Sequence, residues 1–140
     1  MSTLDKTSIL FPMIALAALT FAVLLLIPVR RFRAGFAGQI RDDDFKYGES
    51  ARVPPEVSIP NRNMMNLLEL PLLFYVACLT YLVIERVDGP ALTLAWLYVA
   101  LRIAHSAIHV TYNRVRHRLI AFALSNVVLV MFWTNLIRSL

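Results

Sequence analysis

The hydrophobic residues of this chain fall into four long runs that polar stretches separate. The runs cover residues 9–29, 64–84, 91–112 and 119–137. Each run approaches the roughly 20 residues that an α-helix needs to cross the hydrocarbon core of a bilayer. We therefore predict an all-α integral membrane protein in which residues 1–140 form a single four-helix transmembrane bundle.

Composition supports this prediction and excludes one class of partner. Hydrophobic residues make up 59% of the 140 residues, which is more than an ordinary soluble domain contains. The net charge of +5 does not indicate nucleic-acid binding, because no soluble basic domain is available to carry it. The first run is not expected to be a cleaved signal peptide, since its positive charges (Arg30, Arg31, Arg33) follow the apolar residues.

The distribution of basic residues predicts the orientation. The polar stretch 30–61 and the short turn around residues 113–118 are rich in arginine, whereas the connection between the second and third runs has only Arg86. By the positive-inside rule, the first and third loops are predicted to be cytoplasmic and both termini to lie outside. In a bacterium the membrane would be the inner membrane.

The loops carry further local signals. Helical spacing of apolar residues after Val29 predicts that the first helix continues to about Arg41. The three aspartates 42–44 that follow are expected to form a solvated turn, although a cation site is an alternative. The sequence Val-Asp-Gly-Pro at residues 87–90 predicts a tight turn, which makes the second and third helices antiparallel neighbours.

Polar residues inside the second and third runs are the main functional clue, because ionisable groups in hydrocarbon are costly and usually face a cavity or a partner. Helical spacing places them in two stripes. One stripe consists of Arg102, His105 and His109, and the other of Arg62, Asn66 and Glu69. At ~1.5 Å rise per residue, Glu69 and His105 reach similar depths. We predict a polar pocket that opens toward the cytoplasm, with Arg114 and Arg118 at its rim, and that suits an anionic ligand.

Simpler interpretations remain open for each element. Glu69 and Arg102 could form a structural ion pair. The rim arginines could serve as topology determinants and contact lipid phosphates. The two histidines are one turn apart but lack further metal-ligating residues on their helix, so we predict no metal site. Asn126 is expected to make a hydrogen bond between helices, and the lone Cys78 to be a packing residue.

In their order and spacing, these residues resemble the MAPEG family, the membrane-associated proteins of eicosanoid and glutathione metabolism. The resemblance rests on Arg62-x-x-x-Asn66-x-x-Glu69, on Arg102-x-x-His105, and on the arginines that follow them. The segment Gly38-Gln39-Ile40-Arg41 is similar to the end of the family's first helix. The block from Arg102 to Arg118 looks most like the bacterial branch of the family.

The resemblance implies a homotrimer of four-helix protomers that binds glutathione between neighbouring subunits on the cytoplasmic side. Glutathione would be held by one group of residues: Arg62, Asn66, Glu69, Arg102, His105, His109, Arg114 and, more weakly from a neighbouring subunit, Arg41. Arg118 matches the family's arginine that stabilises the glutathione thiolate and is the candidate catalytic residue. The chain departs from the prostaglandin-forming members at Leu119, which replaces a serine, and at Phe122 and His109, which replace tyrosines.

The leading hypothesis is a glutathione-dependent transferase or peroxidase that acts on lipophilic electrophiles or lipid hydroperoxides. An arginine beside the thiol would favour the reactive thiolate. The alternative is a non-catalytic protein of the same fold that binds a lipid or another small ligand. A multidrug-type transporter is a third class, but its mark is a membrane carboxylate without the cationic wall that this chain has.

Overall fold

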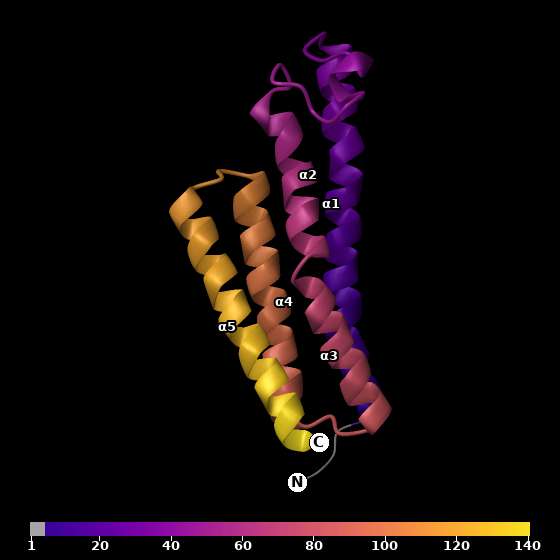
Figure 1. Ribbon diagram of the computed structural model, residues 1–140, viewed down its shortest axis with the longest axis vertical. Helices are drawn as coiled ribbons and strands as arrows, with labels where there is room; N and C mark the ends of the chain where they lie inside the picture. Colours follow the sequence, from indigo (N-terminus) through magenta and orange to yellow (C-terminus); the bar gives the residue numbers. More distant parts are fainter. Residues whose placement is uncertain (1–4) are drawn as a thin grey trace.

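Helices account for all the regular structure of residues 5–140, the part of the chain that the computed structural model describes. The five α-helices are α1 (Leu10–Phe36), α2 (Pro55–Leu68), α3 (Pro71–Ile84), α4 (Gly89–Val110) and α5 (Val115–Ser139). Two short 3-10 helices, η1 (Lys6–Ile9) and η2 (Asp42–Phe45), precede α1 and α2. The α-helices form an elongated bundle in which the first described residues and the C-terminus lie at the same end (Figure 1).

Within residues 5–140, four helical segments are long and apolar enough to cross a membrane. They are Lys6–Phe36, Pro55–Ile84, Gly89–Val110 and Val115–Ser139. The prediction of an all-α bundle with four membrane spans is confirmed, and the protein is a multi-pass integral membrane protein. Most bounds differ from the predicted runs by a few residues, but the second span begins at Pro55 rather than at Met64.

The early start of the second span has a local cause. Pro54 caps α2 and Pro55 occupies its first position, where a missing N–H costs nothing and the fixed φ suits a helix. Many of the residues that follow Pro55 are polar, so the position of the apolar run does not indicate where this helix begins. α2 therefore begins well before Arg62, and Arg62 lies in the body of the helix rather than at its entrance.

The second span is also interrupted in its middle. α2 ends at Leu68, Glu69 has a non-helical backbone (φ −81°, ψ −97°), and α3 begins at Pro71. Proline has no N–H to donate to the carbonyl four residues earlier, and its ring clashes with that carbonyl. The break therefore leaves carbonyl groups at the end of α2 without donors from their own helix.

An aromatic cluster holds the helices together below the break. The ring of Phe74 in α3 stacks on Tyr98 in α4, with centroids 4.8 Å apart, and lies 5.6 Å from Phe132 in α5. Tyr81 adds a second contact with Phe132 at 5.1 Å. These four side chains are fully buried, and their ring contacts join α3, α4 and α5 in this half of the bundle.

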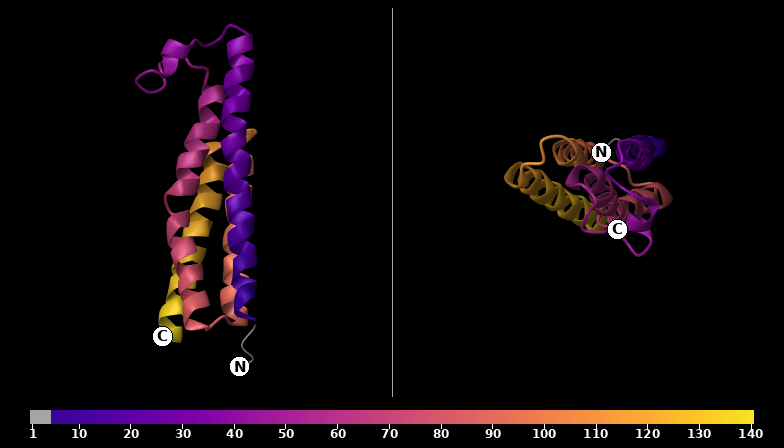
Figure 2. Two further views of the ribbon diagram at one scale, coloured as in Figure 1. Left: turned by 90° about the vertical axis from the view of Figure 1, so that its right-hand side faces the viewer. Right: turned by 90° about the horizontal axis from the view of Figure 1, so that it is seen from above.

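At the opposite end, α1 and α2 project beyond the turn between α4 and α5, and the segment that carries η2 folds over them (Figures 1 and 2). A small apolar cluster forms there around Ala34, Val53 and Val57. Arg30 fixes the projecting pair to the rest of the bundle: its guanidinium donates to the carbonyl oxygens of Glu56 and Val110, each at 2.8 Å. α1 ends at Phe36, before the predicted Arg41.

The aspartate run is not simply a solvated turn. Asp42 and Asp43 are exposed, but Asp44 is only 3% exposed. Its carboxylate accepts hydrogen bonds from the Ser50 hydroxyl at 2.7 Å, the Arg41 backbone N–H at 2.9 Å and the Arg52 guanidinium at 3.0 Å. These bonds, led by that of Ser50, hold the pKa of Asp44 below its usual value. Asp44 is thus the structural centre of the segment.

Candidate functional site

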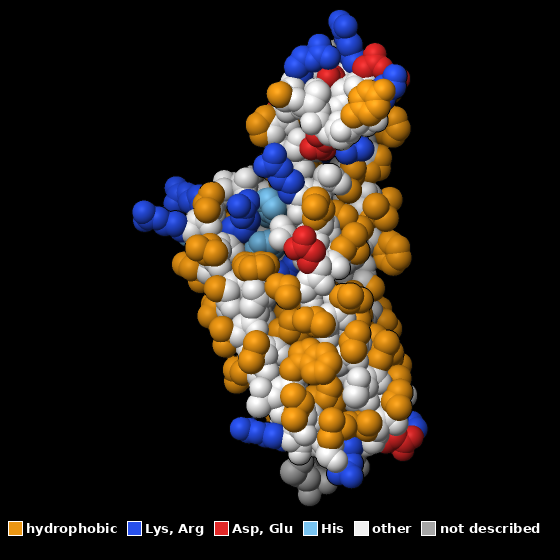
Figure 3. Space-filling model, in the orientation of Figure 1, with side chains coloured by type: hydrophobic (Ala, Val, Ile, Leu, Met, Phe, Trp, Pro, Cys, Tyr) orange, Lys and Arg blue, Asp and Glu red, His pale blue; other side chains and the backbone are white. Residues whose placement is uncertain are grey.

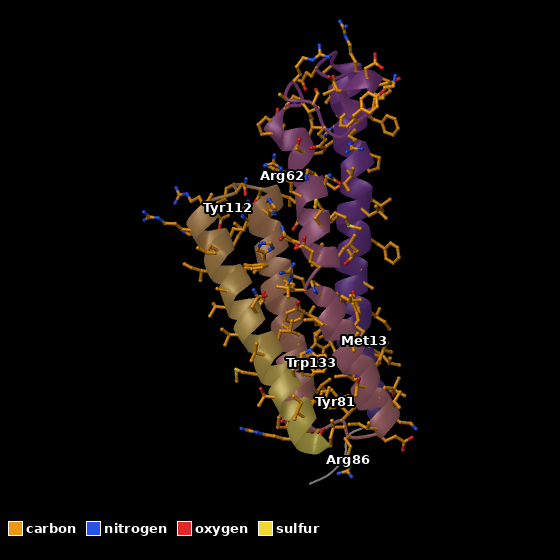
Figure 4. The ribbon with its side chains drawn as sticks, in the orientation of Figure 1. Met13, Arg62, Tyr81, Arg86, Tyr112 and Trp133 are labelled. Atoms are coloured by element: carbon orange, nitrogen blue, oxygen red, sulfur yellow. The ribbon has the colours of Figure 1, made fainter. Side chains whose placement is uncertain are left out.

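A cavity of about 320 Å³ opens between α2, α4 and α5, close to the turn that joins α4 to α5. Its lining residues are Arg62, Asn66, His105, His109, Val115, Arg118, Leu119 and Phe122. Figure 3 shows histidine side chains in a hollow, with Lys and Arg side chains above it and to its left and an acidic side chain to its right. In Figure 4, Arg62 on α2 and Tyr112 at the α4–α5 turn stand at this end of the bundle.

The structure brings together five of the predicted site residues in the wall of this cavity: Arg62, Asn66, His105, His109 and Arg118. The other four, Glu69, Arg102, Arg114 and Arg41, do not line it. Three helices supply the five residues, so the site depends on the tertiary fold and not on one motif.

Arg102 lies behind the cavity wall. Its side chain is completely buried, and its Nη2 donates a hydrogen bond of 2.5 Å to the backbone carbonyl oxygen of Asn66. Its Nε and Nη1 have no hydrogen-bond partner within residues 5–140. Arg102 therefore supplies a donor to the last turn of α2, where the break before Pro71 leaves carbonyls unpaired.

Glu69 is exposed at the break, one turn after Asn66. The ion pairs among the described residues are Lys6–Glu85, Arg31–Glu49 and Arg52–Asp44. Glu69 and Arg102 thus do not form the ion pair that was one interpretation of their spacing. The carboxylate of Glu69 remains available to a ligand or a neighbouring molecule.

The two histidines form the floor of the cavity. His105 and His109 are each 3% exposed, and their rings lie 5.8 Å apart in an edge-to-face arrangement. The Nδ1 atoms of both are buried and have no hydrogen-bond partner in the described part of the chain. No group of three or more His, Cys, Asp or Glu side chains is arranged to hold a metal ion within residues 5–140. A neutral imidazole donates at one ring nitrogen and accepts at the other, so the two histidines suit hydrogen bonds to a ligand in the cavity that they line.

Arg118 is held in one orientation. Its Nη1 donates a hydrogen bond of 2.8 Å to the side-chain oxygen of Asn113. Asn113 adopts a left-handed backbone conformation (φ 47°), which asparagine tolerates better than most residues and which forms the α4–α5 turn. The turn thereby directs a permanently charged group into the cavity wall.

The remaining predicted residues lie elsewhere. Arg114 is exposed at the start of α5, near the cavity but outside its lining. Arg41 is exposed at the start of η2, in the segment that caps the projecting helices. Arg41 therefore does not contribute to the cavity of its own protomer.

The residues that depart from the family pattern are part of the site. Phe122 and Leu119 line the cavity, and the Phe122 ring lies 5.7 Å from the His105 ring and 5.8 Å from the Arg102 guanidinium. The wall formed by α5 is therefore apolar apart from Arg118. The histidines and α2 supply the hydrogen-bonding groups.

Sequence reasoning missed a buried polar pair next to the site. The Ser106 hydroxyl donates to the side-chain oxygen of Asn63 at 3.2 Å, and the Asn63 amide nitrogen has no partner within residues 5–140. Each residue directly adjoins a predicted site residue, Asn63 next to Arg62 and Ser106 next to His105. This adjacency in the sequence is the signal that could have found the pair.

Comparison with known proteins identifies a family for the chain but no individual relative. No curated protein and no solved structure matches the chain. The model of the MAPEG family matches residues 9–138, which is nearly the whole chain. With its four membrane-spanning helices, the chain belongs to the MAPEG family.

Proposed function

We propose that the protein is a glutathione-dependent transferase or peroxidase that acts on lipophilic electrophiles or lipid hydroperoxides. The family includes glutathione transferases and peroxidases as well as non-catalytic members. The observation that carries the proposal is the cavity itself, which Arg62 and Arg118 line together with two histidines inside a membrane bundle. Such a cavity suits a polar anionic ligand and adjoins the hydrocarbon that dissolves a lipophilic one.

In the proposed binding mode, different walls of the cavity bind different groups of the glutathione molecule. Its carboxylates would pair with Arg62 and with Arg114 at the rim, since arginine binds carboxylates through two parallel hydrogen bonds. Its backbone amides would meet Asn66, His105 and His109. Glu69, exposed beside Asn66, would hold the ammonium group.

Arg118 would be the catalytic residue. A thiolate is the attacking form of glutathione, and a fixed positive charge beside the sulfur stabilises it without acting as a base. In a transfer reaction, the sulfur forms a bond to the electrophilic carbon while the leaving group departs with its electron pair. In a peroxidase reaction, two glutathione molecules reduce one hydroperoxide to an alcohol and water and are oxidised to the disulfide.

The proposal also covers the assembly of the protomers and their orientation in the membrane. A homotrimer would place a neighbouring subunit against the open side of the cavity and would bring in Arg41, which does not reach the cavity of its own protomer. The cavity would face the cytoplasm, where glutathione is made, with both termini outside and the chain in a bacterial inner membrane. Residues at the rim would contact lipid phosphates.

A second candidate function is ligand binding without catalysis. It is favoured by Leu119 and Phe122, which line the cavity where a reacting thiol would need hydroxyl donors. A protein of this kind would bind glutathione, a lipid or another small ligand and turn nothing over.

Calorimetric titration of glutathione into the detergent-purified protein tests the proposal. Saturable binding is expected, and Arg118→Ala and Glu69→Ala should weaken it. Arg116→Ala is the matched control, since Arg116 is an exposed arginine on the same helix and does not line the cavity. No binding by the folded parent protein would overturn the proposal.

Turnover of two probes separates the two candidates. Conjugation of 1-chloro-2,4-dinitrobenzene, with release of chloride, reports transferase activity, and reduction of cumene hydroperoxide reports peroxidase activity. Activity that Arg118→Ala abolishes supports the enzyme. Glutathione binding without turnover of either probe supports the ligand-binding protein.

A further inference from the structure

A second polar pocket lies between the end of α1 and the start of α2, where these two helices project beyond the α4–α5 turn (Figures 1 and 2). It encloses about 340 Å³, within the usual range for small-molecule sites. Its lining residues are Arg30, Arg33, Ala34, Gln39, Glu56 and Val57. None of them lines the cavity between α2, α4 and α5, so the two sites are separate.

Arg30 fixes the depth of this pocket in the membrane. Its guanidinium donates to the carbonyl oxygen of Glu56 and to that of Val110, the last residue of α4, each at 2.8 Å. The 22 residues of α4 span about 33 Å, which is just enough to cross roughly 30 Å of hydrocarbon. The end of α4, and Arg30 beside it, therefore lie at the boundary between the hydrocarbon and the lipid headgroups.

The charged groups that line the pocket are available to a ligand. The two bonds of Arg30 use one N–H of each terminal nitrogen, so each nitrogen keeps a second N–H. Arg33 and Glu56 are exposed, and neither takes part in the three ion pairs among residues 5–140. The pocket therefore combines two guanidinium groups with one carboxylate and with the amide of Gln39.

This combination suits a ligand that carries both a phosphate and an ammonium group. Arginine binds phosphate through parallel N–H donors, and lipid phosphates are the abundant anions at the depth of the headgroups. Glu56 would repel a ligand that is only an anion, whereas an ammonium group on the same ligand would pair with its carboxylate. Because the Glu56 backbone binds Arg30, the two residues are close enough for one small headgroup to reach both.

The surface of α1 next to the pocket can hold acyl chains. Val29 and Leu25 precede Arg33 by four and by eight residues, so the three residues form one row along the helix. Val29 is 50% exposed and Leu25 is 66% exposed. A lipid with its headgroup in the pocket would therefore lay its chains against apolar side chains of the same helix.

We propose that this pocket binds the headgroup of a phospholipid that carries a phosphodiester and a primary ammonium group, as phosphatidylethanolamine does. The phosphate would pair with Arg30 and Arg33, and the ammonium group would donate to the Glu56 carboxylate. The inference goes beyond the proposed function, because the site requires neither glutathione nor catalysis. A bound lipid would hold the projecting ends of α1 and α2 at the membrane surface.

Native mass spectrometry of the detergent-purified protein measures this selectivity. The probes are phosphatidylethanolamine, phosphatidylcholine and phosphatidylglycerol, all with dioleoyl chains and titrated without glutathione. Phosphatidylethanolamine should bind roughly 3- to 10-fold more tightly than either of the others, because it alone has ammonium N–H groups to donate to Glu56. The choline nitrogen carries no hydrogen, and the glycerol headgroup has no cation.

Variants of the two charged walls test the assignment. Glu56→Gln should remove most of the preference for phosphatidylethanolamine, whereas the control Asp43→Asn should keep it, because Asp43 is exposed at the same end and does not line the pocket. Arg33→Gln should weaken phosphatidylethanolamine binding roughly 3- to 10-fold. Its control is Arg138→Gln, an exposed arginine at the end of α5. Far-ultraviolet circular dichroism confirms that each variant remains helical.

Three results would overturn the inference. Equal binding of the three lipids by the parent protein would mean that the pocket does not select a headgroup. A preference that persists in Glu56→Gln would place the selective site elsewhere. Equally tight binding of soluble glycerophosphoethanolamine would show that the site does not depend on a membrane lipid. All readings are taken without glutathione, so they are independent of whether the calorimetric titration detects glutathione binding.

Discussion

The guanidinium of Arg102 and the backbone carbonyl of Asn66 lie 2.5 Å apart, and this hydrogen bond joins α4 to the end of α2. It is made at the point where Pro71 prevents the second span from continuing as one helix. A positive charge at the C-terminal end of a helix is also favourable for the helix dipole. Arg102 therefore fixes the backbone of a residue whose side chain lines the cavity.

The first prediction concerns Arg102→Gln. Removing the charged donor should lower the free energy of unfolding by about 1–3 kcal/mol, because a buried carbonyl loses its partner. It should also weaken glutathione binding, since Asn66 is no longer held in place. Denaturant unfolding in detergent measures the first effect, and calorimetry measures the second. Arg86→Gln, an exposed arginine in the turn at the other end of the bundle, is the control.

The helix break provides a second variant that checks this explanation. Pro71→Ala removes the ring clash and restores an N–H that can donate to the Leu67 carbonyl, so α2 and α3 should join. In the continuous helix, the Leu70 N–H would donate to the Asn66 carbonyl. Arg102→Gln should then cost less stability in the Pro71→Ala background than alone. Equal costs in both backgrounds would show that Arg102 does not act by capping α2.

Asn113→Gly is predicted to weaken glutathione binding roughly 5-fold, which corresponds to about 1 kcal/mol for one hydrogen bond. Glycine tolerates the left-handed conformation at this position, so the turn survives while the amide that holds Arg118 is removed. Calorimetry measures the effect. If glutathione binds equally weakly to Arg118→Ala and to the double variant Asn113→Gly/Arg118→Ala, then Asn113 acts through Arg118. A further loss in the double variant would contradict this route.

The sequence predicted which residues share a helix face better than it predicted where a helix is interrupted. Helical spacing correctly places Arg62 and Asn66 on one wall, and His105 and His109 on the facing one. The same spacing assigned Arg102 to the cavity, because a regular helix puts it on the face of His105. The structure instead buries Arg102 against the end of α2, and only the break at Pro71 creates the carbonyl that it binds.

Two other features could not be read from periodicity. The apolar pattern does not mark the start of α2, whose first turns are polar and rest on the projecting part of α1. Asp44 is one of three identical neighbours in the sequence, and only the fold of the segment selects it for burial. Both features depend on contacts between segments outside the apolar runs, where hydrophobic pattern carries little information.

The segment around Asp44 is predicted to loosen at acid pH. The folded protein lowers the pKa of Asp44, so the carboxylate contributes stability that is fully present above the unfolded value of about 3.9 and is lost as the pH falls through the lower, folded value. Limited proteolysis of residues 37–54 should therefore accelerate severalfold between neutral pH and pH values below about 3.9, with a protease active at both. Asp44→Asn should show rapid cleavage already at neutral pH.

Asp43→Asn is the control for this measurement, because Asp43 is exposed and accepts no side-chain hydrogen bond like those of Asp44. It should retain slow cleavage at neutral pH. If Asp43→Asn and Asp44→Asn are cleaved equally fast, the effect belongs to the total charge of the aspartate run and not to the buried carboxylate.

Phe122→Tyr tests whether the apolar α5 wall limits the chemistry. Phe122 lines the cavity beside His105, so a hydroxyl added to its ring would place a donor where the proposed thiolate lies. One additional hydrogen bond to the thiolate should raise the fraction of ionised bound glutathione roughly 2- to 10-fold, and conjugation of 1-chloro-2,4-dinitrobenzene should rise with it. The ultraviolet absorbance of the thiolate measures the first quantity directly. Phe21→Tyr is the control, because Phe21 is exposed on α1 and does not line the cavity. A rise in thiolate without a rise in turnover would show that thiolate formation does not limit the reaction, and no change in either would place the sulfur away from Phe122.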